Sequence, residues 1–324
     1  MKAPVPKILV IRGGALGDFI LTLPAIRLLR ETFPEAELEV LGYPRIASLV
    51  DKRFYASRVR SIDYGPMAGF FAKNGVLDPG LSEYFAGFQQ VISYMFDPDG
   101  IFEANVRRAG VKHYLAAYRR PVAQHAAREW AAPLEALAMY LESPAAQLFP
   151  SDSDKAGARE WLGGRCGEVL AVHPGSGSPK KNWGAALWAQ VGEFYWQQFP
   201  EGEIVLVGGE ADAEVLRALE GAWRGRRVRW AVGLGLPELA AVLAECGRFA
   251  GHDSGISHLA AAVGAKCVLL FGPTAPEVWA PMNAGVSVLR APGGDFEQLR
   301  VSEVWVRIRD ELLLESQAPL SAEG

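Results

Sequence analysis

The segment from Gly251 to Ala262 holds the strongest candidates for chemistry in this sequence. It reads GHDSGISHLAAA, a pattern typical of a strand end, a tight polar turn and a helix of small residues. Ser254 and Gly255 stand where the helix would begin, so backbone N–H groups should point out of that end and attract an anion. His258 could donate to the same anion, and Asp253 could accept from hydroxyl groups. The segment predicts a phosphate-and-polyol site; the alternative is an ordinary capped turn.

A second polar loop, residues 173–183, follows an apolar run and reads HPGSGSPKKNW. Glycines and hydroxyl residues such as Ser176 let a backbone approach a phosphate closely, and a lysine adds a compact positive charge. The loop lacks the G-x-x-x-x-G-K-[ST] pattern of a P-loop. A solvated surface loop is the alternative, and the adjacent Lys180 and Lys181 leave the choice of lysine open.

Two further loops follow predicted strands in the second half of the chain. Glu210 ends the run Gly-Gly-Glu at 208–210, and the ends of parallel strands are where open α/β sheets bind ligands. Glu210 could accept from two ribose hydroxyls, or it could begin the next helix and serve its dipole. The loop at 271–281 is interpreted as structural, shaping the edge of a cleft.

Near the amino terminus, the loop at 13–18 resembles a dinucleotide fingerprint but lacks the G-x-G-x-x-G spacing. The next strand, 37–42, carries no carboxylate at its tip, which argues against a nicotinamide-dependent dehydrogenase. Asp18 stands at the start of a predicted helix. An accessible carboxylate there could act as a general base toward a hydroxyl; capping of the helix is the alternative.

Metal and disulfide signals are weak. The D-x-D patterns at 97–99 and 152–154 have the form that some sugar transferases use for a divalent metal, but the form is common by chance, so we predict no metal. The first, after a strand, keeps a metal open as an alternative. The scattered Cys166, Cys246 and Cys267 fit neither a metal site nor a disulfide framework and indicate a reducing cytoplasm.

Hydrophobic periodicity predicts two successive arrays of strands and helices. Apolar runs predict strands at 7–12, 37–42, 58–64, 90–96, 169–174, 204–207, 227–232, 248–251 and 266–271. Helical spacing predicts helices at 19–33, 100–109, 124–141, 185–199, 211–219, 237–246 and 304–314. A Pro- and Ser-rich linker at 144–154 separates domains 1–150 and 151–324. We therefore expect two Rossmann-like domains facing across a cleft, with the closing helix a candidate to pack back on the first.

Composition narrows the function classes. A chain of 324 residues, half of them hydrophobic, can bury two substantial cores, and a net charge of −4 argues against a nucleic-acid surface. We expect no signal peptide and no membrane span. A basic cluster is a candidate contact for a phosphorylated lipid at a membrane surface, or a solvated face. It consists of Arg107, Arg108, Lys112, Arg119 and Arg120.

Together, three segments resemble the lipopolysaccharide heptosyltransferases, glycosyltransferase family 9. They are VIRGGALGD with TLPA at 10–25, HPGSGS with KNW at 173–183, and DSGISHLAAA with FGPT at 253–274. They occur in the family's order and cover the first fifty residues and most of the second half, whereas residues 65–123 match poorly.

The resemblance implies a GT-B fold and an inverting, metal-independent transfer, without a cofactor, from ADP-heptose to a lipid A–core saccharide. It implies that the N-terminal domain binds the acceptor, with Asp18 as the base for its hydroxyl, and that the C-terminal domain binds the nucleotide sugar. Ser176 and Lys181 would hold the diphosphate, Glu210 the adenosine ribose, and Leu236 would lie near the adenine.

The helix end completes the implied donor site. Ser254, Gly255 and His258 would close on the diphosphate, and Asp253 would hold the sugar hydroxyls. Gly177, in the diphosphate loop, stands where some relatives have a second hydroxyl residue. Two alternatives stay open: a transferase of the same fold with another nucleotide sugar and glycan, and a nucleotide-sugar-binding protein without chemistry.

Overall fold

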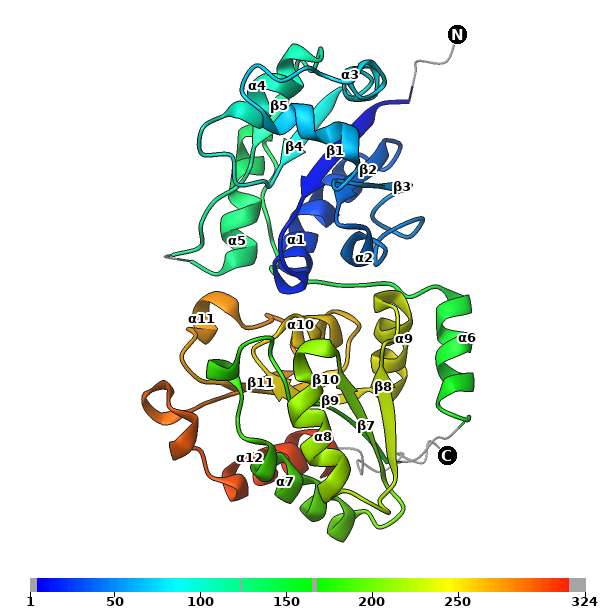
Figure 1. The fold of residues 1–324 in the computed structure, drawn as a ribbon, viewed down its shortest axis with the longest axis vertical. Coiled ribbons are helices and arrows are strands. Elements are labelled where there is room, and N and C mark those ends of the chain that lie inside the picture. Colours follow the sequence, from blue (N-terminus) through cyan, green and yellow to red (C-terminus); the bar gives the residue numbers. More distant parts are fainter. Residues whose placement is uncertain (1–4, 123, 165–167, 315–324) are drawn as a thin grey trace, which may run out of the picture. The chain divides into compact units, whose positions relative to one another are not determined.

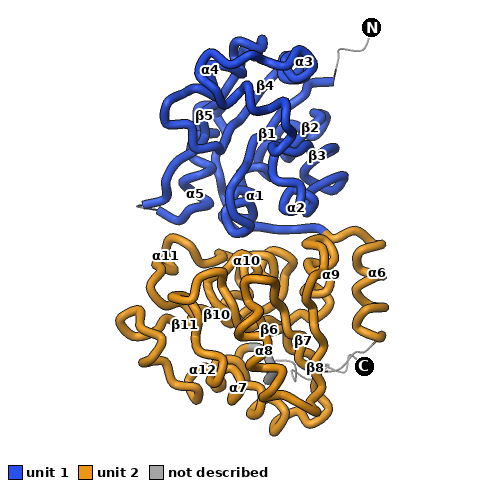
Figure 2. Tube along the Cα trace, viewed as in Figure 1, with its two compact units in different colours: residues 1–149 blue, residues 150–324 orange. Residues whose placement is uncertain are grey.

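The computed structural model describes residues 5–122, 124–164 and 168–314. The chain divides into two compact units, residues 1–149 and 150–324 (Figure 2). Each unit is built on one parallel β-sheet whose strands alternate with helices (Figure 1). The expected fold class, two parallel α/β domains, is confirmed.

The first sheet has the strand order β3-β2-β1-β4-β5. Its strands are β1 (Lys7–Arg12), β2 (Glu37–Gly42), β3 (Arg58–Ser61), β4 (Gln90–Ser93) and β5 (Tyr114–Ala116). Its helices are α1 (Leu16–Thr32), α2 (Pro44–Ala47), α3 (Pro79–Ala86), α4 (Ile101–Arg108) and α5 (Ala126–Ala131), with 3-10 turns η1 (Gly65–Phe71) and η2 (Ala132–Leu137). β1 is central and its residues 9–11 are fully buried, as an apolar strand covered on both faces should be.

The second sheet has the order β11-β10-β9-β6-β7-β8. Its strands are β6 (Val169–His173), β7 (Glu203–Gly208), β8 (Val228–Val232), β9 (Arg248–His252), β10 (Lys266–Phe271) and β11 (Val286–Arg290). Its α-helices are α6 (Asp152–Trp161), α7 (Ala185–Gln198), α8 (Ala213–Ala222), α9 (Leu236–Cys246), α10 (Gly255–Ala262), α11 (Pro276–Trp279) and α12 (Val301–Ile308). Short turns complete it: η3 (Pro179–Lys181), η4 (Glu210–Asp212), η5 (Pro292–Gly294), η6 (Phe296–Gln298) and the π-helical η7 (Arg309–Leu314).

The strand order determines which loops lie together at the carboxyl edge of each sheet. In each sheet the chain runs outward to one edge and then returns to the other side of its first strand. The reversal falls between β1 and β4 in the first sheet and between β6 and β9 in the second. The carboxyl ends of the strands beside such a reversal are where open α/β sheets bind ligands.

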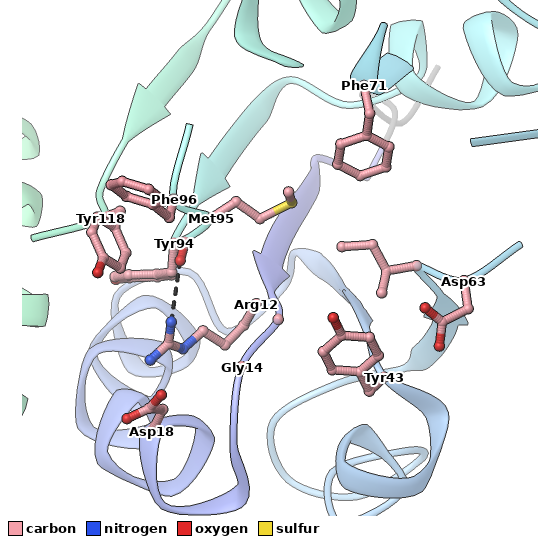
Figure 3. Close-up of a pocket in the computed structure, with 12 residues that line it drawn as sticks. Arg12, Gly14, Asp18, Tyr43, Asp63, Phe71, Tyr94, Met95, Phe96 and Tyr118 are labelled. Carbon is pink, nitrogen blue, oxygen red and sulfur yellow. Dashed lines mark hydrogen bonds between the residues drawn. The ribbon is translucent and has the colours of Figure 1, made fainter. Parts of the chain in front are cut away.

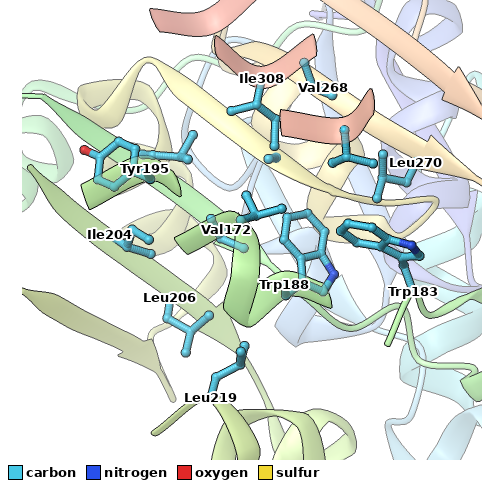
Figure 4. Close-up of a cluster of buried hydrophobic side chains, with 14 of the residues drawn as sticks. Val172, Trp183, Trp188, Tyr195, Ile204, Leu206, Leu219, Val268, Leu270 and Ile308 are labelled. Carbon is cyan, nitrogen blue, oxygen red and sulfur yellow. The ribbon is translucent and has the colours of Figure 1, made fainter. Parts of the chain in front are cut away.

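A dense aromatic core supports the second sheet. Trp183 and Trp188 are fully buried and meet edge to face, their ring centroids 5.5 Å apart (Figure 4). Val304 and Ile308 of α12 enter the same core. The closing helix therefore contributes to the core of the second unit.

Most predicted elements are present, and the strands 7–12, 37–42 and 266–271 have the predicted bounds. The single helix expected at 124–141 is wrong: α5 ends at Ala131 and a 3-10 turn follows, because Pro133 has no N–H to continue the α-helical pattern. The expected linker was too long, since α6 begins inside it with a capping box between Ser151 and Asp154. The strands β5 and β11 were missed.

The free thiols of Cys246 and Cys267 are buried, and burial raises the pKa of each to about 12, so both stay protonated. Cys166 lies outside the described residues. None of the helices in the described ranges has the length and apolarity needed to cross a bilayer.

Candidate functional site

Asp18 lies in the first turn of α1, at the carboxyl end of β1. The cap position belongs to Ala15, which makes no side-chain capping bond, so Asp18 is not the capping residue that the alternative required. Its side chain is partly exposed. Gly14 has a φ of +96°, and a Cβ there would lie 3.2 Å from Asp18 Oδ2 and 3.8 Å from Arg12 Nη1. A side chain at position 14 would therefore crowd both the Asp18 carboxylate and the Arg12 guanidinium, and glycine leaves that space open.

Arg12, the last residue of β1, is a buried cation beside Asp18. Only 4% of it is exposed; its guanidinium lies 4.4 Å from the centre of the Trp130 ring and donates from Nη1 to the Tyr94 carbonyl at 3.1 Å (Figure 3). Among the described residues, Nε and Nη2 have no hydrogen-bond partner. Burial lowers the pKa of Arg12, and the charge of Asp18 opposes that shift. Asp18 is thus the main electrostatic partner of this buried charge.

Both residues line a pocket of about 420 Å³ at the switch point of the first sheet. Phe96 and Tyr118 form one side of it, with ring centroids 5.3 Å apart, and Tyr43 and Asp63 lie on the other side (Figure 3). The pocket joins aromatic faces, a carboxylate beside a cation, and further polar groups. Such a lining suits a hydroxylated ring with apolar C–H faces, and sequence reasoning missed its aromatic part.

In the second unit, Lys181 and Asp253 lie together. Lys181 Nζ is 2.7 Å from Asp253 Oδ2, and the Thr274 hydroxyl donates to the same oxygen at 2.8 Å. Asp253 is 7% exposed. The loops after three strands, β6, β9 and β10, thus meet at one carboxylate. Thr274 belongs to the loop that we interpreted as structural; its position after a strand next to β9 was the available signal.

The predicted helix start is confirmed at α10. Ser254 is its N-cap and accepts from the Ser257 N–H at 3.3 Å. The Ser254 hydroxyl also lies 3.2 Å from Nδ1 of His173, whose Nε2 lies 3.3 Å from Asp212 Oδ2. Asp212 further accepts from the Gly209 N–H at 2.9 Å. This chain of hydrogen bonds fixes the N-terminus of α10 relative to the loops after β6 and β7.

The charge state of Asp212 follows from that chain. Burial alone would raise its pKa, but the hydrogen bond and charge of His173 and the N–H of Gly209 outweigh burial and lower it. A Cβ on Gly175 would lie 1.8 Å from Asp212 Oδ1. A glycine is therefore required at this point of the 173–183 loop.

His252, the last residue of β9, holds both ends of the 173–183 loop and was not singled out from the sequence. It is fully buried; its Nε2 accepts from the backbone N–H of Trp183 at 2.8 Å, and its Nδ1 lies 3.4 Å from the Gly175 carbonyl. Burial, with the charge of His173, lowers the pKa of His252 to about 3. The imidazole is therefore neutral and acts as a structural acceptor.

The remaining predicted donor residues have different surroundings. The Ser176 hydroxyl is held within its own loop, 2.6 Å from Asn182 Oδ1 and 2.9 Å from the Ser178 carbonyl oxygen, and can donate to one of them at a time. Gly177 is exposed and has a φ of +73°, a conformation that favours glycine. Glu210 is exposed at the carboxyl end of β7.

Leu236 is the first residue of α9 and is buried, as is His258 one turn into α10. The second sheet brings the loops after β6, β7 and β9 to one edge. Lys181 pairs with Asp253 there, and Ser254, the next residue in the chain, bonds to His173.

The discounted motifs have structural roles. Both Asp97 oxygens accept backbone N–H groups at the start of α4, from Phe102 at 3.2 Å and Glu103 at 2.9 Å. In the basic cluster, Arg107 pairs with Glu103 at 2.8 Å, and Arg108 donates to the Gly75 carbonyl. At least these two arginines are engaged within the protein.

The model of glycosyltransferase family 9 (heptosyltransferase) matches residues 102–302, more than half of the chain. The Asp18 segment lies outside that range. The lipopolysaccharide heptosyltransferase 2 of Salmonella typhimurium is 23% identical over 316 residues, 88% of each chain. The lipooligosaccharide heptosyltransferase 2 of Haemophilus influenzae is 28% identical over 138 residues, and the chain spans about two fifths of that protein.

Solved structures share the fold. A family 9 glycosyl transferase from Veillonella parvula superposes with a TM-score of 0.79 at 19% identity, covering 97% of this chain and 99% of that one. The ADP-heptose lipopolysaccharide heptosyltransferase II of E. coli gives 0.78 at 18% identity, covering 96% and 99%. At these identities the likeness concerns the fold.

Proposed function

Because the chain belongs to glycosyltransferase family 9 (heptosyltransferase), we propose that it transfers heptose from ADP-heptose to a saccharide of the lipopolysaccharide core. The relatives carry that activity in their names. The observation that carries the proposal is the cluster at the second sheet's edge. There Lys181 Nζ lies 2.7 Å from Asp253 Oδ2, and Asp253 directly precedes Ser254, the N-cap of α10.

In the proposed donor complex the diphosphate lies at the N-terminus of α10, at Ser254 and Gly255. Backbone N–H groups and the helix dipole favour an anion there, and Lys181 adds a full positive charge. Lys181 exchanges part of its contact with Asp253 for the phosphates. The carboxylate of Asp253 then accepts from sugar hydroxyls, while the Thr274 hydroxyl keeps its hydrogen bond to Asp253 Oδ2.

Further residues complete the proposed donor site. Ser176 and Gly177 line the diphosphate from the loop after β6, and His258 supports it from within α10. Glu210, exposed after β7, accepts from the adenosine ribose. Leu236, at the start of α9, lies near the adenine. Each role rests on the family's pattern and on the position of the residue at the carboxyl edge of the sheet.

Asp18 is the proposed general base. The acceptor oxygen attacks the anomeric carbon as the bond to the diphosphate breaks, and its proton passes to Asp18 while ADP leaves with the electron pair. Attack opposite the leaving group inverts the anomeric configuration. The growing charge on ADP is met by Lys181 and the N–H groups of α10. The partly exposed carboxylate of Asp18 in a pocket supports this role.

The proposed reaction uses neither a metal nor a cofactor. The Asp97 carboxylate, the metal candidate that the sequence left open, is engaged by two backbone N–H groups. We expect activity to survive a chelator; a loss that manganese restores would contradict this part of the proposal.

The deciding experiment is a product assay. The protein is incubated with ADP-heptose and a deacylated core saccharide, and the product is analysed by mass spectrometry and by NMR of the anomeric proton. We expect one added heptose of inverted configuration. Thermal shifts with ADP, UDP and GDP form the control: only ADP should stabilise the protein. Stabilisation by UDP or GDP would favour another donor, and binding without product a non-catalytic protein.

The proposal includes a cytoplasmic location with peripheral contact at the inner membrane, where a lipid-linked acceptor is met. Cell fractionation at low and high salt tests it: we expect soluble protein with a salt-sensitive membrane fraction. A wholly soluble protein at low salt would contradict the contact.

A further inference from the structure

We infer that Phe96 and Tyr118 form an aromatic platform in the Asp18 pocket that receives the ring of a neutral acceptor sugar. The inference rests on the proposed function, since it specifies the group that Asp18 would deprotonate. It adds that the acceptor ring is uncharged and that Phe96 and Tyr118 select it.

The platform is defined by exposure and contact. Phe96 is 69% exposed and Tyr118 is 37% exposed, and their rings meet edge to face at 60°. They follow β4 and β5, which are neighbours in the first sheet. When a ligand covers an exposed aromatic ring at the wall of a pocket, apolar surface leaves water, and this favours binding. The electron-rich face of an aromatic ring attracts the C–H edge of a partner, and one face of a sugar ring presents such C–H groups.

Polar groups complete the requirements of a sugar. Asp63 and Tyr43 are exposed on the side opposite the platform and can bond to hydroxyl groups (Figure 3). Asp18 lies on the same side as Tyr118, next to the buried Arg12. A ring stacked on the platform therefore has carboxylates around its edge, where its hydroxyls lie.

The charges favour a neutral ring. The charged residues that line the pocket are Arg12, Asp18 and Asp63. Arg12 is almost fully buried, so the accessible charges of the lining are the two carboxylates. A carboxylate or phosphate on the bound ring would meet negative charge with no accessible cation in the lining to balance it.

The test uses two soluble synthetic oligosaccharides that differ in the terminal sugar, one neutral and one bearing a carboxylate. Binding to the full chain is measured without donor by ligand-observed NMR, and transfer is measured with ADP-heptose. We expect the wild-type protein to bind the neutral saccharide more tightly. Phe96→Ala and Tyr118→Ala should each weaken that binding about three- to tenfold.

Matched variants separate the platform from general damage. Phe96→Trp should retain affinity, and Tyr140→Ala, at an exposed tyrosine that lines a different pocket, should change nothing. ADP affinity should be equal in all variants. Unchanged saccharide binding by Phe96→Ala, or tighter binding of the acidic saccharide, would overturn the inference. If saccharide binding needs Phe96 but no heptose is transferred, the proposed function is refuted and the inference about the platform stands.

Discussion

The two edges that we propose as ligand-binding sites are built differently. At the second sheet the polar groups satisfy one another: Lys181 and Thr274 bond to Asp253, and Ser254 bonds to His173. At the first sheet the pocket has exposed aromatic rings and a buried Arg12 with two N–H sites that lack partners among the described residues. The second edge is preorganised by its own hydrogen bonds, as the proposed diphosphate site requires, whereas the first presents exposed aromatic rings beside carboxylates.

The sharpest test of this division is Asp18→Ala. We expect transfer to fall by about 10²- to 10⁴-fold, because a positioned base contributes that much to proton transfer. ADP affinity should be unchanged, since Asp18 belongs to the first unit. Initial rates and calorimetric ADP titration provide the two readouts. Transfer at the wild-type rate would remove Asp18 as the base; Asp18→Asn controls for shape.

Lys181→Ala should act on the other edge. Loss of a charge-assisted bond to the diphosphate should weaken ADP binding by about 1.5–3 kcal/mol. Binding of the acceptor saccharide should be unchanged. Calorimetry measures the first and ligand-observed NMR the second. Lys180→Ala is the matched control from the same loop, and a larger loss of ADP affinity there would transfer the role to Lys180.

His252 makes the stability of the second edge depend on pH. Burial holds its pKa near 3, against an ordinary value of 6.5. Between these values the unfolded chain binds one more proton than the folded one, so this contribution to stability is present above pH 6.5 and is lost as the pH falls. The slope should approach 1.4 kcal/mol per pH unit.

Urea unfolding of wild type and His252→Gln from pH 7 to 4.5 measures this effect. The glutamine can accept from Trp183 but does not titrate, so its curve should be flatter, even if it lies lower at pH 7. Parallel curves would show that His252 does not carry the dependence.

Thr274→Val should give the smallest effect. It removes one of two hydrogen bonds to Asp253 Oδ2 and leaves the Lys181 ion pair. We expect the KM for the donor to rise about three- to tenfold, the equivalent of one hydrogen bond, with the acceptor KM unchanged. Thr274→Ser restores the hydroxyl and should restore the KM. A loss of kcat with unchanged KM would indicate a different role for this loop.

The local sequence pattern was sufficient to predict the two α/β units and the start of α10. Apolar runs and helical spacing gave most of the strands, and the polar turn before small residues correctly located the beginning of α10 at Ser254. These features depend on neighbouring residues in the chain, which is what hydrophobic period and capping chemistry report. Pro133, read as part of one helix, is the case where a local signal was present and overlooked.

The sequence by itself determined that there are two α/β units, where Asp18 and Ser254 fall on their helices, and which family the chain resembles. Only the tertiary structure decided which of these residues meet. Lys181 reaches Asp253 across 72 residues, and His173 lies between Ser254 and Asp212, because β9 pairs with β6 and not with β8, its predecessor along the chain. Phe96 and Tyr118 meet because β5 pairs beside β4, so the loops after both strands end at the same edge of the sheet. Strand order is a property of the whole packed sheet, so contacts between strand-end loops are absent from any local pattern.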